Sequence, residues 1–122
     1  MMVPLISMAA LKQLIDGKAP FRLIDVRNKD ELVHGMIPTA KNIPLPEFEE
    51  ALDLPEKDFE KRYGFSKMKK TEDLIVHCRT GGRSAVAAAI AEKRGYKVRN
   101  FLGSTWEWAT IDLKVKRYGP SP

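Results

Sequence analysis

Short, mainly apolar runs alternate with amphipathic stretches along this chain. The apolar runs at residues 21–26, 74–77 and 97–101 predict buried strands, because polar residues bound each of them. The first helix is predicted from Ser7, a good N-cap, to Gly17 as a left-handed C-cap. Asn28 and Glu31 have the spacing of a capping box and predict a helix start after the first strand.

The second half of the chain repeats this alternation. Residues 46–70 predict one or two amphipathic helices, residues 84–94 a helix closed by Gly95, and residues 106–109 the start of a last short helix. Strands that alternate with helices through short connections predict an α/β fold, with a mostly parallel central sheet and helices on both faces. We expect one domain over residues 1–122, since a chain of 122 residues can bury a substantial core.

Composition excludes several classes of protein. The single cysteine excludes a disulfide-stabilised secreted module and a cysteine-rich zinc site, so we expect no metal. A net charge of +5 suits anionic partners, but basic and aromatic residues do not interleave, so we expect no nucleic-acid partner. No run approaches the ~18 apolar residues of a membrane span, and the start is too short for a signal peptide. We expect a cytoplasmic protein without a membrane partner, or a mitochondrial one if a transit segment has been removed.

The loop between the strand at 74–77 and the helix at 84–94 carries the candidate chemistry. It combines a thiol, two glycines and two arginines at the carboxyl end of a strand, where α/β sheets bind ligands. Its residues are Cys78, Arg79, Thr80, Gly81, Gly82, Arg83 and Ser84. The glycines let the loop curl so that backbone N–H groups point inward, and the next helix adds its positive end.

A thiol at the base of such an anion-binding loop is expected to have a lowered pKa and to act as a nucleophile. An isolated cysteine after a strand is more often a small buried apolar residue. The flanking arginines and glycines favour the nucleophile for Cys78.

Four blocks of the sequence resemble those of a single-domain rhodanese, of the thiosulfate sulfurtransferase family. Asp25-Val26-Arg27 is similar to the Asp-x-Arg block, residues 34–44 to the Gly-His-Ile-Pro block, the Cys78 loop to the active-site loop, and residues 103–108 to the C-terminal Gly-Gly-x-x-x-Trp block. The order His34-Gly35 is inverted, and Thr39 and Ser104 stand where the family has glycine. The resemblance implies a three-layer rhodanese-like domain.

The resemblance also implies the reaction. Cys78 takes a sulfane sulfur from thiosulfate or another persulfide donor, holds it as a covalent persulfide without a cofactor, and passes it to a thiol or cyanide. A thioredoxin-like or other protein acceptor is an alternative. Residues 79–84 bind the substrate, with Arg79 and Arg83 on the oxyanion end.

Two other functions remain open. Cysteine-based phosphatases place five residues between cysteine and arginine, whereas four residues separate Cys78 from Arg83, so phosphatase activity is the weaker enzymatic alternative. The third possibility is a rhodanese-like binding or regulatory module, although such modules commonly lack the cysteine.

The remaining candidates are supporting residues. Asp25 and Arg27 could brace the loop through a charge-assisted pair, and Trp106 could line the pocket. Arg83 could point toward substrate or toward solvent. His77 precedes Cys78 on a strand, so its side chain is expected on the opposite face, as a hydrogen-bonded core histidine rather than a general base.

Overall fold

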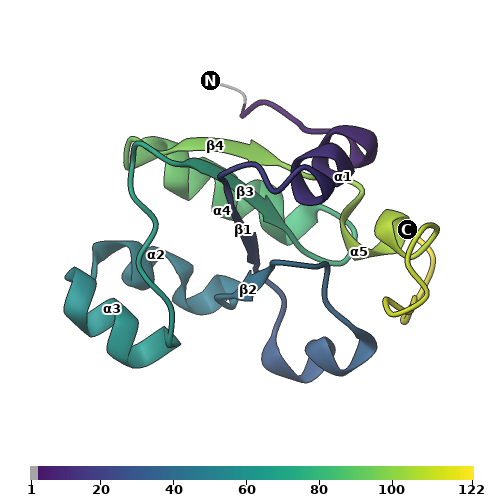
Figure 1. Cartoon of the computed structure of the whole chain (residues 1–122). Coiled ribbons are helices and arrows are strands. Elements are labelled where there is room, and N and C mark those ends of the chain that lie inside the picture. Colours follow the sequence, from purple (N-terminus) through teal and green to yellow (C-terminus); the bar gives the residue numbers. More distant parts are fainter. Residues whose placement is uncertain (1–2) are drawn as a thin grey trace.

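A computed structural model describes residues 3–122 of the chain (Figure 1). The elements, in chain order, are α1 (Met8–Asp16), β1 (Arg22–Asp25), the 3₁₀ helix η1 (Lys29–His34), β2 (Lys41–Asn42), α2 (Leu45–Asp53), α3 (Glu56–Tyr63), β3 (Asp73–His77), α4 (Gly82–Lys93), β4 (Lys97–Asn100) and α5 (Ser104–Trp108).

The four strands form one sheet in the order β2-β1-β3-β4, and every neighbouring pair is parallel. In register, Ile24 of β1 lies beside Val76 of β3, and Val76 lies beside Asn100 of β4. Because all four strands point the same way, their carboxyl ends share one edge of the sheet, and the loop that begins at Cys78 leaves from that edge.

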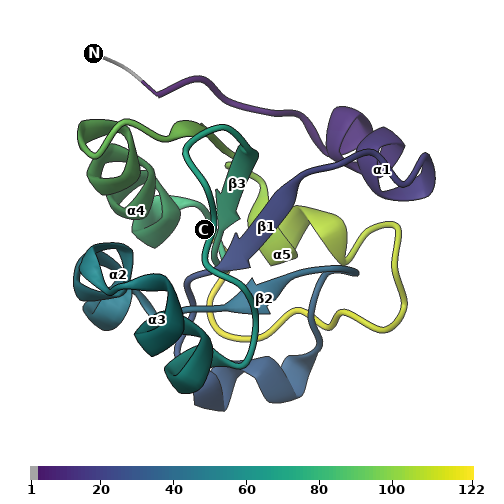
Figure 2. The ribbon, with the colours of Figure 1, turned by 60° about the vertical axis from the view of Figure 1, so that its left-hand side comes forward.

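Helices cover both faces of the sheet (Figure 2). One face carries α2, α3 and α4, and the other carries α1 and α5. Side chains alternate between these layers: Ile24 and Val76 belong to the core beneath α4, whereas Leu23 and Ile75 belong to the core beneath α1. The predicted α/β fold with a parallel sheet between helices is confirmed.

Most predicted elements occur at the predicted places. Ser7 caps α1 by accepting a hydrogen bond from the Ala10 N–H at 3.1 Å. The stretch after β2 forms two helices, and α4 begins at Gly82, two residues before the predicted start at Ser84. The segment after Asn28 is a 3₁₀ helix, in which the Asn28 N–H donates to Glu31 Oε1 at 3.0 Å.

The predicted left-handed C-cap at Gly17 is wrong. Gly17 has a φ of −80°, and the left-handed residue is Lys18, with a φ of 52°. The Ala19 N–H bonds to the Leu14 carbonyl and the Lys18 N–H to the Ile15 carbonyl. This is a Schellman motif, which places the left-handed conformation one position after the C-cap.

Within residues 3–122, no helix combines the length and the apolar character needed to cross a membrane.

Candidate active site

Cys78 lies at the base of a loop that turns directly from β3 into α4. Its side chain is buried, and its Sγ accepts a hydrogen bond from the Gly81 N–H at 3.0 Å. Gly81 has a φ of 98°, which glycine adopts without strain. A Cβ at this position would also lie 2.5 Å from the carbonyl oxygen of Leu102, so both conformation and space require glycine here.

The surroundings of the thiol favour its ionised form. Burial raises the pKa of Cys78, but hydrogen bonds from the Ser84 hydroxyl and from the N–H groups of Ser84, Gly81 and Thr80 outweigh burial and lower it. Ser84 Oγ lies 3.5 Å from Sγ. This arrangement, a thiol with a lowered pKa at the N-terminus of α4, is the one expected of a nucleophilic cysteine.

Ser104 supports the cysteine from the neighbouring loop, although the sequence analysis noted it only as a replacement for glycine. Its hydroxyl accepts the Cys78 N–H at 3.0 Å, donates to the Phe101 carbonyl at 3.0 Å, and lies 3.9 Å from Sγ. The residue is fully buried and has a φ of 54°. A non-glycine residue in this conformation is strained, so the surrounding contacts hold it there.

Arg83 points toward η1, where it pairs with Glu31 through both carboxylate oxygens. This pairing lowers the pKa of Glu31 to about 2, since hydrogen bonds from Arg83 outweigh the opposing effect of burial. Arg83 is thus fixed beside the loop by an ion pair whose side chains are only partly exposed.

Arg79 points toward the C-terminal segment. Its Nη1 donates to the carbonyl oxygens of Tyr118 at 3.0 Å and Pro120 at 2.9 Å. Its guanidinium carbon lies 5.6 Å from the ring centre of Trp106, which places the predicted supporting tryptophan beside this arginine.

Asp25 and Arg27 form a buried ion pair beneath the site. Arg27 Nη2 lies 2.8 Å from Asp25 Oδ2, and both side chains are fully buried. Arg27 also donates to the Gly35 carbonyl and to the Tyr118 hydroxyl. The link from this pair to the Cys78 loop is indirect: Tyr118 also bonds to Glu31, and Glu31 pairs with Arg83 of the loop.

His77 is fully buried, as expected of a core residue. Its Nδ1 lies 3.1 Å from the Cys78 carbonyl oxygen, but its Nε2 has no hydrogen-bond partner and lies 3.8 Å from Asp25 Oδ2. The expectation of a fully hydrogen-bonded histidine is therefore wrong at one ring nitrogen. Burial lowers the pKa of His77, so the ring is neutral near pH 7.

Sequence reasoning missed Tyr118 as a site residue and noted Glu31 only as a helix cap. The Tyr118 hydroxyl donates to Glu31 Oε2 at 2.8 Å, and its ring stacks on His34 at 4.0 Å between centroids. No local pattern marks these residues, because their partners lie 87 positions apart along the chain.

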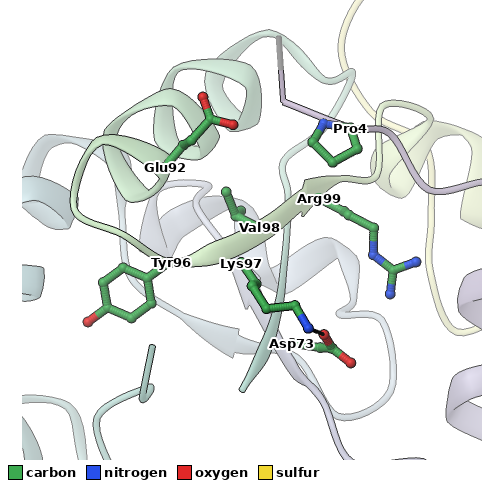
Figure 3. A pocket seen from close by; sticks show the side chains of 7 residues that line it. All are labelled: Pro4, Asp73, Glu92, Tyr96, Lys97, Val98 and Arg99. Carbon is green, nitrogen blue, oxygen red and sulfur yellow. Dashed lines mark ion pairs between the residues drawn. The ribbon is translucent and has the colours of Figure 1, made fainter. Parts of the chain in front are cut away.

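A separate hollow of about 320 Å³ lies at the edge of β4, formed in part by Asp73, Tyr96 and Lys97 (Figure 3). Lys97 turns toward Asp73, with its Nζ 3.6 Å from Oδ1. Asp73 and Lys97 are the first residues of β3 and β4, so this part of the hollow lies at the opposite end of the strands from the Cys78 loop.

Comparison with known proteins agrees with this geometry. Residues 7–111 match the family described as Rhodanese-like domain. A protein of Schizosaccharomyces pombe, provisionally named a mitochondrial thiosulfate sulfurtransferase, is 46% identical over 88 residues, which are 71% of this chain and 62% of that protein. The human thiosulfate:glutathione sulfurtransferase is 38% identical over 108 residues, 86% of this chain and 92% of its own.

A solved structure extends the comparison to three dimensions. The human single-domain sulfurtransferase TSTD1 superposes with a TM-score of 0.85 at 34% identity, covering 89% of this chain and 97% of its own. The chain belongs to the family of rhodanese-like domains. The prediction of a sulfurtransferase of this family is confirmed by these relatives.

Proposed function

We propose that this protein is a thiosulfate sulfurtransferase that carries the transferred sulfur as a persulfide on Cys78. The observation that carries the proposal is the Cys78 thiol held by the Gly81 N–H and the Ser84 hydroxyl at the start of α4. The names of the fission yeast and human relatives support thiosulfate as the donor.

The reaction proceeds in two balanced steps. The Cys78 thiolate attacks the outer sulfur of thiosulfate, the S–S bond of the donor breaks, and sulfite leaves with the bonding electron pair. A thiolate or cyanide then attacks the terminal sulfur of the persulfide, and Cys78 leaves as the thiolate. Neither step needs a metal or an organic cofactor, because no net electrons enter or leave.

The loop stabilises the charged states of this cycle. The N–H groups of Thr80, Gly81 and Ser84 face the sulfur and stabilise negative charge on the thiolate and on the persulfide. Arg79 and Arg83 flank the loop and supply positive charge for the sulfonate end of thiosulfate.

The proposed acceptor is a small thiol of the glutathione type. The name of the human relative supports this choice. A protein acceptor of the thioredoxin type is the alternative, and the net charge of +5 suits either anionic thiols or an acidic partner.

The cytoplasm is the expected compartment, and the mitochondrion is its alternative. The word mitochondrial in the name of the fission yeast relative favours that alternative. Fractionation of cells that express the natural protein decides between the two.

The test is the intact mass of the purified protein before thiosulfate, after thiosulfate, and after cyanide, beside a Cys78→Ser variant. We expect a gain of one sulfur atom that cyanide reverses and that the variant lacks. A protein that gains no sulfur from thiosulfate or from a small persulfide is not a sulfurtransferase. Hydrolysis of p-nitrophenyl phosphate would then indicate a phosphatase, and its absence a binding module.

A further inference from the structure

Tyr118, in the C-terminal segment, contacts Arg27 and Arg79 directly and Arg83 through Glu31. This segment returns past α5 and η1 (Figure 2), where the Lys116 N–H bonds to the His34 carbonyl and Arg117 Nε to the Trp106 carbonyl. These contacts hold Tyr118 beside Arg27 and Arg79, which both donate hydrogen bonds to it.

The hydroxyl of Tyr118 links two of these arginines. It accepts a hydrogen bond from Arg27 Nη1 at 3.1 Å and donates to Glu31 Oε2 at 2.8 Å. Glu31 Oε2 in turn accepts from Arg83 Nη2 at 2.9 Å. The orientation of Arg83 therefore depends on a carboxylate that Tyr118 helps to fix.

The backbone and ring of Tyr118 hold the third arginine. The Tyr118 carbonyl accepts Arg79 Nη1 at 3.0 Å, and the ring centre lies 5.8 Å from the Arg79 guanidinium carbon. The stack of the ring on His34 fixes the ring itself. Gly119 has a φ of 75°, and a Cβ there would meet Arg79 Nη1 at 3.3 Å, so the segment fits closely against this arginine.

We propose that Tyr118 is a positioning residue that fixes Arg79 and Arg83 beside the Cys78 loop, where their positive charge binds the sulfonate end of the sulfur donor. The proposal rests on the thiosulfate sulfurtransferase function proposed above. It assigns Tyr118 to the first half-reaction alone, because cyanide in the second half-reaction brings no sulfonate. Preorganised arginines avoid the entropic cost of ordering long side chains when the donor binds.

The test separates the two half-reactions in Tyr118→Phe. This change removes the hydroxyl and its bonds to Arg27 and Glu31, but keeps the ring and the backbone carbonyl. We expect the KM for thiosulfate to rise about fivefold to tenfold, because a hydrogen bond contributes roughly 1 kcal/mol. Discharge of a preloaded Cys78 persulfide by cyanide should keep the rate of the unchanged protein.

A second variant tests the contact with Arg79. Gly119→Ala adds a methyl group against Arg79 Nη1 at a backbone angle that alanine adopts poorly. We expect the same pattern, a higher KM for thiosulfate with an unchanged rate of discharge.

Tyr63→Phe is the matched control. Tyr63 also donates to a glutamate, Glu47 Oε1 at 2.9 Å, and Glu47 also pairs with an arginine, Arg62. This triad lies on α2 and α3 and has no hydrogen bond to the Cys78 loop or to its arginines, so its loss should leave the KM for thiosulfate unchanged.

Three results would overturn the assignment of Tyr118: an unchanged KM in Tyr118→Phe, an equal loss in both half-reactions, or the same KM change in Tyr63→Phe. Failure of the function itself looks different, because the unchanged protein would then gain no sulfur from thiosulfate. Thermal unfolding of each variant confirms that the proteins compared are folded.

Discussion

Arg83 on α4 and Glu31 on η1 lie 52 positions apart in the chain and form a two-point ion pair beside the Cys78 loop. The Glu31 side chain is 16% exposed, and Tyr118 supplies it with a further hydrogen bond. The pair joins the Cys78 loop to the element that follows β1, so it contributes to stability as well as to the candidate site.

This ion pair should make the stability of the protein depend on pH in acid. The pKa of Glu31 is about 2 in the folded protein and near 4.5 in the unfolded chain, so the carboxylate stabilises the fold fully above pH 4.5. That contribution is lost as the pH falls from 4.5 toward 2. Urea unfolding should find Glu31→Gln less stable than the unchanged protein at pH 7, with a difference that shrinks below pH 4.5. A difference in stability that stays constant down to pH 2.5 would contradict a stabilising role for the Glu31 carboxylate.

Ser84→Ala should raise the pKa of Cys78, because the hydrogen bond between the Ser84 hydroxyl and Sγ lowers that pKa. A hydrogen bond to a charged group contributes roughly 1.5 kcal/mol, so alkylation by iodoacetamide at pH 7 should slow by up to about tenfold. The rate is measured as a function of pH, and the single cysteine makes the signal unambiguous. Ser7→Ala, which removes the cap of α1, is the control that changes stability without changing thiol reactivity. Equal slowing in both variants would show that Ser84 does not act on the thiol.

Two substitutions of Ser104 separate the cost of a lost hydrogen bond from the cost of backbone strain. Ser104→Ala keeps the left-handed backbone and leaves the buried Cys78 N–H without an acceptor, so it should cost about 1–3 kcal/mol. Ser104→Gly loses the same acceptor but relieves a strain of roughly 1 kcal/mol. Urea unfolding should therefore rank the unchanged protein first, the glycine variant second and the alanine variant third. An alanine variant as stable as the glycine variant would show that the backbone at residue 104 is not strained.

Arg27→Met should destabilise the fold severely. It leaves the Asp25 carboxylate buried without its partner, which costs about 3–5 kcal/mol. Unfolding in urea measures the loss, and Arg62→Met is the control because its partners Glu47 and Glu50 are more exposed. A small effect at Arg27 would mean that water or another group satisfies Asp25 in the variant.

Much of the fold could be predicted from the sequence because the strands are short, apolar and bounded by polar residues. The error at the end of α1 has a local cause. Glycine was expected to be the left-handed residue, but the Ala19 N–H bond to the Leu14 carbonyl places that conformation at Lys18. Two hydrogen bonds satisfy the helix end and offset the strain of a lysine there.

In the candidate site, too, the contacts between residues close in sequence could be predicted, whereas the contacts between distant residues could not. The thiol, the turn at Gly81 and the hydroxyl of Ser84 lie within seven consecutive residues, so their arrangement could be predicted from their spacing. The orientation of Arg83 could not, because it is decided by Glu31 and Tyr118. The hydroxyl of Ser104 reaches Cys78 across 26 positions and has no sequence signal beyond its place in a glycine-rich block.

The difference between local and distant contacts in the site has a consequence for the order of folding. The donors that face Sγ are neighbours in sequence, whereas the contact between Arg27 and Tyr118 closes a loop of 91 positions, which has a larger entropic cost. We expect a refolding chain to gain the donors around the thiol early and the arginine arrangement last. Thiol reactivity would then recover before affinity for the sulfur donor, so the two readouts would report different stages of assembly.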